Sequence, residues 1–160
     1  MSAVFSFTIS EARQIFQKTF QYNQSSSHSG IAMIRDTTGD LFLISYVVGV
    51  GAGGMDILVK RTDSIGNIKW AKIYGTSGTN TPFNAIMTST GEIIIVCQSV
   101  KVAGMWNRDI LLFKIDINGN IIWWKSFGNT SGDLYGIDIN EITEGNFIVT
   151  GGTSYGDSTT

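Results

Sequence analysis

The stretch Asp109–Gly128, with the sequence DILLFKIDINGNIIWWKSFG, decides the fold of this chain of 160 residues. Its first half, Ile110–Ile115, is a run of branched and aromatic residues, which is typical of a strand buried on both faces. Asp116–Asn120 then supplies Asp, Asn and a glycine that can adopt a positive φ, which favours a tight turn. Ile121–Phe127 resumes as a strand, so the stretch predicts a β-hairpin.

The same hairpin occurs 53 residues earlier (109 − 56 = 53), at Asp56–Gly75, with the sequence DILVKRTDSIGNIKWAKIYG. The matched pairs are Asp56 and Asp109, Asp63 and Asp116, Gly66 and Gly119, Ile68 and Ile121, and Trp70 and Trp123. A third copy, in which Glu11–Gln14 replaces the glycine turn, is expected at residues 4–20. A short helix capped by Ser10 and ending at Phe20 is the alternative for that segment. The repeat register favours the hairpin.

A second type of hairpin alternates with the first. Its strands are expected at Ile31–Ile34 with Leu41–Val48, at Phe83–Met87 with Glu92–Val100, and at Tyr135–Ile139 with Asn146–Thr153. Two additional residues precede the turn glycine of the third copy, which predicts a β-bulge there. We call the two strands of this second type of hairpin a and b, and those of the first type c and d. Each repeat then holds four antiparallel strands in the order a, b, c, d.

Four antiparallel strands in a repeat of about 50 residues favour an all-β fold of β-propeller blades, with a solenoid of sandwiches as the alternative. The chain is then a single domain, 1–160, with a c–d half-blade at 4–20, blades at 30–74 and 83–127, and an a–b half-blade at 135–153. These are three blade equivalents, and propellers close with about four to eight. We therefore expect a head-to-tail homodimer of six blades, in which half-blades of two chains combine. A fragment of a longer propeller is the alternative.

The pattern D-I-L-L-x-K-x-D-x-x-G-N-I-x-W-x-K-x-(F/Y)-G, followed by T-S-G and G-(N/E)-x-I-(I/V)-V, resembles extracellular β-propeller repeats of bacteria and archaea, of the SBBP and PQQ-like type. In PQQ-like blades a glycine turn followed by a tryptophan forms a docking contact between neighbouring blades. The resemblance gives Trp70 and Trp123 this structural role, although the spacing from Asp to Gly is one residue shorter here. Such propellers host many activities, so the resemblance implies a fold and not a function.

Composition excludes several classes of partner. The net charge is −2 and no run of Lys or Arg exists, so nucleic-acid binding loses its usual electrostatic basis. No apolar run approaches the roughly 18 residues of a membrane span, and we expect no membrane insertion. The first ten residues lack the basic and apolar regions of a signal peptide. The localisation stays open, and the export of the resembling repeats favours an extracellular surface or a virion over the cytoplasm.

We expect no cofactor and no metal. Cys97, the single cysteine, follows an apolar run and is expected to be a buried, inert thiol. His28 is the single histidine, which excludes a metal site built on histidines within one chain and favours a solvated loop residue. Asp116–Gly119 is similar to the start of a calcium loop but lacks the last ligand, so a turn is expected. Gly49–Gly54 is similar to a phosphate-binding loop, but a strand follows where that mechanism needs a helix.

The connections b–c and d–a are long and differ from repeat to repeat, as expected of a recognition face on a rigid scaffold. Trp106 lies in this loop face, outside the repeat pattern and directly before the polar residues Asn107 and Arg108. Trp and Arg are enriched in binding hot spots. The alternative is that Trp106 folds back over the blade edge. The candidate binding residues of the loop face are His28, Trp106, Asn107, Arg108, Asp133 and Tyr155.

These features predict a non-enzymatic binding and assembly module, a structural or interaction protein of a surface or virion. Its expected partners are a second copy of the chain, another surface or virion protein, or a glycan. A carbohydrate-binding propeller is the alternative, although unequal loops argue against repeated pockets. A sialidase-like hydrolase ranks third, because it needs a cluster of carboxylate, tyrosine and arginine, and few candidates such as Asp138 and Arg35 exist.

Overall fold

The computed structural model describes residues 4–6, 17–20, 27–100, 108–128 and 132–154, and these residues form an all-β structure without a helix. The strands are β1 (Val4–Ser6), β2 (Gln17–Thr19), β3 (His28–Arg35), β4 (Leu41–Val48), β5 (Met55–Thr62), β6 (Ile68–Tyr74), β7 (Thr79–Met87), β8 (Ile93–Val100), β9 (Arg108–Ile115), β10 (Ile121–Phe127), β11 (Asp133–Thr143) and β12 (Asn146–Ser154). Within these ranges the chain contains no helix that could cross a membrane.

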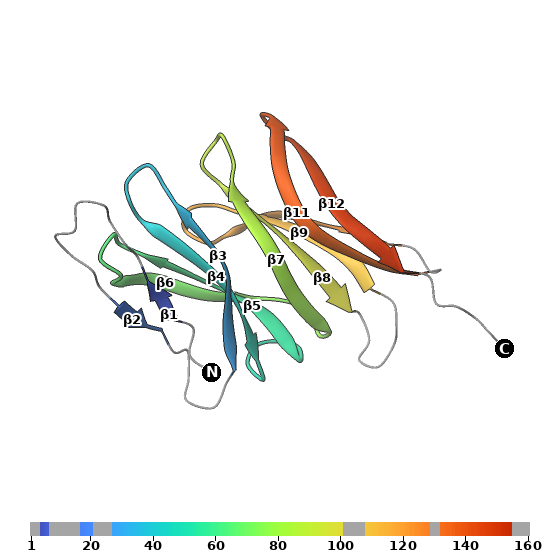
Figure 1. The fold of residues 1–160 in the computed structure, drawn as a ribbon, viewed down its shortest axis with the longest axis horizontal. Coiled ribbons are helices and arrows are strands. Elements are labelled where there is room, and N and C mark those ends of the chain that lie inside the picture. The colour runs from blue at the N-terminus through green and yellow to red at the C-terminus, as the bar shows by residue number, and fades with distance from the viewer. Residues whose placement is uncertain (1–3, 7–16, 21–26, 101–107, 129–131, 155–160) are drawn as a thin grey trace.

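Strands β3–β6 and β7–β10 form two antiparallel meanders of four strands each, which we call unit 1 and unit 2. One parallel bridge, between Met55 and Thr79, joins the two units. Strands β1–β2 and β11–β12 are separate two-stranded sheets, and Figure 1 places β1–β2 beside unit 1 and β11–β12 beside unit 2, at opposite ends of the molecule. The described strands do not close into a ring. The number of blades and their closure therefore stay predictions.

The turns that join β5 to β6 and β9 to β10 have the same hydrogen bonds. The glycine N–H donates to the carbonyl of the Asp three residues earlier, at 3.1 Å from Gly66 to Asp63 and 2.9 Å from Gly119 to Asp116. Both glycines have a positive φ, 82° and 74°, which residues with a Cβ rarely adopt. The sequence D-x-x-G-N thus determines the hairpin in both units.

The largest apolar cluster joins units 1 and 2, and the middle strands are buried on both faces. In β8, Ile93 and Ile95 pack with Phe42 of unit 1, whereas Ile94 packs with Ile139 of β11. Successive side chains of a strand point to opposite faces, so one strand serves two neighbouring layers. This arrangement explains the continuous apolar run that the sequence shows at this strand.

Cys97, in the same strand, is fully buried, and its Sγ donates to the carbonyl of Leu111 at 3.1 Å. Burial raises the pKa of this thiol well above its usual value. The prediction that Cys97 is buried is confirmed.

The b strand β4 has the predicted bounds, Leu41–Val48. The a strands, in contrast, begin earlier in the chain than predicted. Strand β3 begins at His28 instead of Ile31, and β7 begins at Thr79, within a segment that the sequence indicated as a polar loop. His28 is buried, with 6% of its surface exposed, so the prediction of a solvated loop histidine was wrong. Pro82 is tolerated in β7 because the register shifts between Pro82 and Asn84, where a bulge interrupts the ladder.

The first segment forms a hairpin in its described residues. Val4–Ser6 pairs with Gln17–Thr19, so the alternative of a helix from Ser10 to Phe20 is wrong for β2. The bulge predicted in the third a–b hairpin is confirmed by a register shift between Glu141 and Thr143.

Candidate functional site

The turn between β9 and β10 is held rigid by Asp116. Its Oδ1 accepts hydrogen bonds from the backbone N–H groups of Asn118 and Asn120, both at 2.8 Å, and its Oδ2 accepts one from the Asn120 side chain at 2.9 Å. The N–H of Asn120 is the main cause that lowers the pKa of the Asp116 carboxyl. The carboxylate is thus used inside the turn, and the expectation of a turn at Asp116–Gly119 is confirmed.

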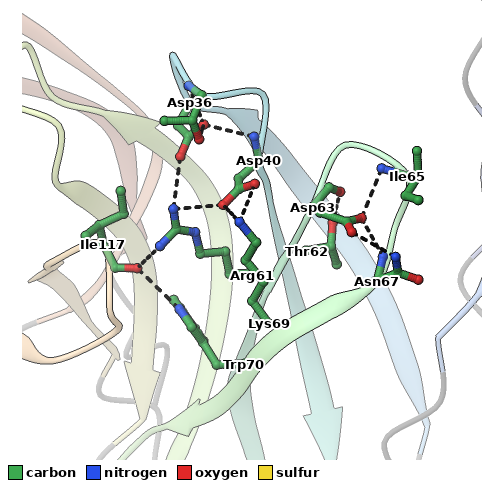
Figure 2. A network of polar contacts seen from close by, with 11 residues as sticks. Asp36, Asp40, Arg61, Thr62, Asp63, Ile65, Asn67, Lys69, Trp70 and Ile117 are labelled. Atoms are coloured by element: carbon green, nitrogen blue, oxygen red, sulfur yellow. Dashed lines mark hydrogen bonds and ion pairs between the residues drawn. The ribbon is translucent and has the colours of Figure 1, made fainter.

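The face of unit 1 formed by β5 and β6 receives this turn. The carbonyl of Ile117 accepts hydrogen bonds from Arg61 Nη1 at 3.2 Å and from Trp70 Nε1 at 3.3 Å, as Figure 2 shows. The carbonyl of Gly119 accepts from Tyr74 Oη at 2.7 Å and from Lys72 Nζ at 3.0 Å. Four side chains of one unit therefore bind two backbone carbonyls of the next unit.

Close packing accompanies these hydrogen bonds. The Trp70 ring contacts Phe42 edge-on, with centroids 6.0 Å apart, and the Lys72 amine lies 5.8 Å from the centre of the Trp70 ring. Tyr74 is only 8% exposed, and its burial raises the pKa of its hydroxyl. A Cβ at Gly119 would lie 2.7 Å from the Tyr74 hydroxyl, so only glycine fits at this point of the contact.

An acidic pair orients Arg61 toward the turn. Its Nη2 lies 2.8 Å from Asp40 Oδ2 and 3.3 Å from Asp36 Oδ2, and Lys69 also pairs with Asp40 at 2.6 Å (Figure 2). Burial raises the pKa of Asp36, but hydrogen bonds from Thr38 and Asp40 outweigh this effect and lower the pKa overall. The ionised carboxylates therefore fix the guanidinium whose other nitrogen bonds Ile117.

A related contact joins β1–β2 to unit 1. Lys18 Nζ donates to Asn67 Oδ1 in the unit 1 turn at 3.2 Å, as Lys72 Nζ donates to Asn120 Oδ1 in the unit 2 turn at 3.2 Å. The hairpin β1–β2 thus contacts the turn of β5–β6, and β5–β6 contacts the turn of β9–β10. In both places a lysine of one hairpin donates to the turn asparagine of the next hairpin in the chain.

The equivalent face on β9 and β10, 53 residues further along the chain, carries Lys114, Trp123, Lys125 and Phe127. We call these four residues the open face. Lys125 lies 5.5 Å from the centre of the Trp123 ring, and Lys114 pairs with Glu92 at 3.2 Å, as Arg61 pairs with Asp40. Phe127 is 49% exposed, whereas Tyr74 at the equivalent position is buried. Within the described residues no hairpin turn bonds to the open face.

The structure brings together two of the predicted binding residues. Arg108 begins β9 and Asp133 begins β11; the Arg108 N–H donates to Asp133 Oδ1 at 3.0 Å, and Arg108 Nε lies 3.7 Å from Asp133 Oδ2. His28 is buried at the start of β3. Three other predicted binding residues, Trp106, Asn107 and Tyr155, lie outside the described residues.

The described ranges contain no group of three His, Cys, Asp or Glu residues able to hold a metal ion. A hollow of about 140 Å³ between units 1 and 2 is mostly apolar, lined on unit 2 by Leu111, Phe113, Ile121 and Trp124. Asp138, a candidate for the hydrolase hypothesis, instead accepts a hydrogen bond from the Asn84 side chain of unit 2.

The repeat pattern indicated the tryptophans of these faces, but Arg61, Lys72 and Tyr74 were not among the predicted contact residues. The signal was present, because a basic or aromatic residue recurs 53 positions after each of them. No known protein family matches the sequence, and comparison with curated proteins finds no relative.

Proposed function

We propose that this chain is a non-enzymatic binding and assembly module of the β-propeller type, in which four-stranded units stack face to face as blades. The observation that carries the proposal is the contact between units 1 and 2, where the turn of one hairpin binds the face of the preceding unit through Arg61, Trp70, Lys72 and Tyr74. Such a contact is directional, so each unit offers a turn to one neighbour and a face to the other. A directional contact of this kind supports head-to-tail association.

Free strand edges support self-association. Among the described residues, β1 pairs only with β2, and β12 pairs only with β11. Unpaired strand edges expose backbone donors and acceptors that another strand can satisfy. Pairing of β1 with β12 between two copies would complete a four-stranded unit at each junction. The result is a closed homodimer of six units, as expected for a propeller.

A rigid assembly of this kind suits a structural or interaction role at a surface or on a virion. Its loop face would contact a further protein or a glycan, near the paired Arg108 and Asp133. Loops on a rigid scaffold are the usual place for such recognition.

The test is the mass of the chain in solution, measured by sedimentation equilibrium over a wide range of protein concentration. The expected result is a particle of twice the chain mass of 17.4 kDa. A cooperatively folded monomer at every concentration would contradict the proposal. Deletion of residues 1–20 should abolish the dimer, because it removes one partner of each shared unit.

A further inference from the structure

We infer that the open face of Lys114, Trp123, Lys125 and Phe127 is the docking site for the β1–β2 hairpin of a second copy of this chain. The inference rests on the proposed self-assembly and assigns the residues that carry it. Its basis is the continuity of one type of contact. This contact joins units 1 and 2 through four side-chain donors, has its lysine–asparagine bond repeated between β1–β2 and unit 1, and has no equivalent at the open face within the described residues.

The open face is arranged for the same contact before any turn is bound. The distance from lysine to tryptophan ring is 5.5 Å for Lys125 and Trp123, against 5.8 Å for Lys72 and Trp70. Lys114 is anchored by an acidic residue of the a–b turn, Glu92, whose pKa is lowered to about 2 by hydrogen bonds from Thr88 and Thr90. Three donors of the occupied face, from Arg61, Trp70 and Lys72, thus have counterparts here.

The difference between the two faces is exposure. Phe127 is 49% exposed, and Trp123 is only partly buried, at the hydrophobic cluster against which Phe147 and Val149 of β12 also pack. The open face and the unpaired edge of β12 could thus bind one hairpin together. A strand of that hairpin would pair with β12, and its turn would contact β10. This is how β9–β10 is placed with respect to β8 and unit 1.

The fourth position of the face indicates which hairpin fits. At the occupied face the Tyr74 hydroxyl lies so close to Gly119 that a Cβ would be 2.7 Å from it. In the sequence of the first hairpin, Arg13 stands 53 residues before Gly66 and 106 before Gly119, so that turn has no glycine at this position. The open face has Phe127 in place of Tyr74 and therefore lacks the hydroxyl. The absence of that hydroxyl removes the closest of the three contacts that a Cβ at Gly119 would make, the other two being with Trp70 and Lys72 at 3.0 Å.

The hairpin must come from another copy. In its own chain β1–β2 lies at the opposite end of the molecule from β12 (Figure 1). There Lys18 of β2 donates a hydrogen bond to Asn67 in the turn of unit 1. The edge of β1 that does not face β2 is unpaired among the described residues. One copy can therefore keep its own contact to unit 1 and still offer β1 to the β12 edge of a partner.

The test compares the dimer dissociation constants of two variants by sedimentation velocity across a dilution series. In Lys125→Glu/Phe127→Glu the open face loses a lysine donor and its apolar ring, while Lys114 and its ion pair with Glu92 are left unchanged. We expect dimerisation to weaken at least about 30-fold, the effect of losing a binding hot spot. The matched control is Trp124→Glu, a side chain 64% exposed on the opposite face of β10, which should change the constant less than about 3-fold.

Hydrogen exchange identifies the occupant. The amides of Val4–Ser6 and of β12 should both gain protection when the protein is concentrated from monomer to dimer. Protection of β12 without protection of Val4–Ser6 would show that another segment docks, and it would overturn the inference. Circular dichroism of each variant checks that its monomer is folded.

The outcomes separate this inference from the proposed function. A wild-type monomer at all concentrations removes both. A wild-type dimer that the Lys125→Glu/Phe127→Glu variant leaves intact removes the docking site alone. Equal weakening by Trp124→Glu would place the interface on the opposite face of β10 and would also refute the site.

Discussion

Replacement of Trp70 by Ala tests the contact between units 1 and 2 inside one chain. The substitution removes the edge contact with Phe42 and the hydrogen bond from Trp70 Nε1 to the Ile117 carbonyl at 3.3 Å. Trp70 is half-buried, so the loss is smaller than for a tryptophan deep in a core. The carbonyl keeps its second donor, Arg61 Nη1, so no buried acceptor is left without a partner.

The magnitude follows from these contacts. A half-buried Trp side chain removes about 100 Å² of apolar surface from water, worth about 2.5 kcal/mol at 25 cal/mol per Å². The hydrogen bond adds about 1 kcal/mol. We expect Trp70→Ala to lower the free energy of unfolding by about 3.5 kcal/mol. Trp70→Phe retains a ring against Phe42 and loses the N–H donor, so it should cost about half as much.

The assay is urea unfolding followed by circular dichroism, at one fixed protein concentration so that association contributes equally. Trp124→Ala is the control, since this exposed tryptophan should change the free energy of unfolding by less than about 0.5 kcal/mol. A loss below about 0.5 kcal/mol for Trp70→Ala would refute the docking contact as a source of stability. Equal losses for Trp70→Ala and Trp70→Phe would show that the hydrogen bond, and not the packing, carries the contact.

Three further predictions concern the turns and the acidic anchor. Both Gly119 and Gly91 have a positive φ, so replacing either by Ala strains the backbone. Only a Cβ at residue 119 also meets the Tyr74 hydroxyl, so Gly119→Ala should lower the free energy of urea unfolding by about 1 kcal/mol more than Gly91→Ala. Gly75→Ala should cost about 2 kcal/mol or more, since its Cβ would lie 1.8 Å from Oδ1 of the buried Asp56, whereas Gly54→Ala meets only the Thr79 hydroxyl at 3.3 Å and should be milder. Hydrogen bonds from Thr88 and Thr90 lower the pKa of the Glu92 carboxyl from 4.5 to about 2 in the folded protein. Its contribution to the free energy of unfolding is therefore complete above pH 4.5 and is lost as the pH falls toward 2. The stability advantage of wild type over Glu92→Gln should shrink in that pH range, and a pH-independent difference would contradict the prediction.

The hairpins were predictable from sequence because their turns are local. Asp63 and Gly66 lie within one turn, and the hydrogen bonds that define it join residues at most four apart. The start of the a strands was not predictable in this way. Thr79–Pro82 reads as loop by composition, yet it pairs with β8 through a register that a bulge allows. Tertiary pairing overrides local preference in such a segment.

The candidate site was predictable only in part, for a related reason. The recurrence of Trp70 and Trp123 indicated a contact between units, but it did not show which carbonyls the indoles bind. Arg61 and Lys72 are long polar side chains of a kind usually solvated, and their partners lie 47 to 56 residues away in sequence. Only the stacking of unit 2 on unit 1 brings these groups together.

The two faces would select different turns, which bears on how assembly could stop at a closed particle. A turn with glycine gains a fourth hydrogen bond, from the Tyr74 hydroxyl, at the occupied face and cannot gain it at Phe127. A side chain at that turn position would meet the Tyr74 hydroxyl at the occupied face; this closest contact is absent at Phe127, where Trp123 and Lys125 take the places of Trp70 and Lys72. Specificity is a difference between affinities, and here one change of residue favours the intended turn while disfavouring the other. In the proposed assembly, a glycine turn of another copy would bind the open face with one hydrogen bond fewer, which would disfavour the open-ended head-to-tail contacts that produce filaments.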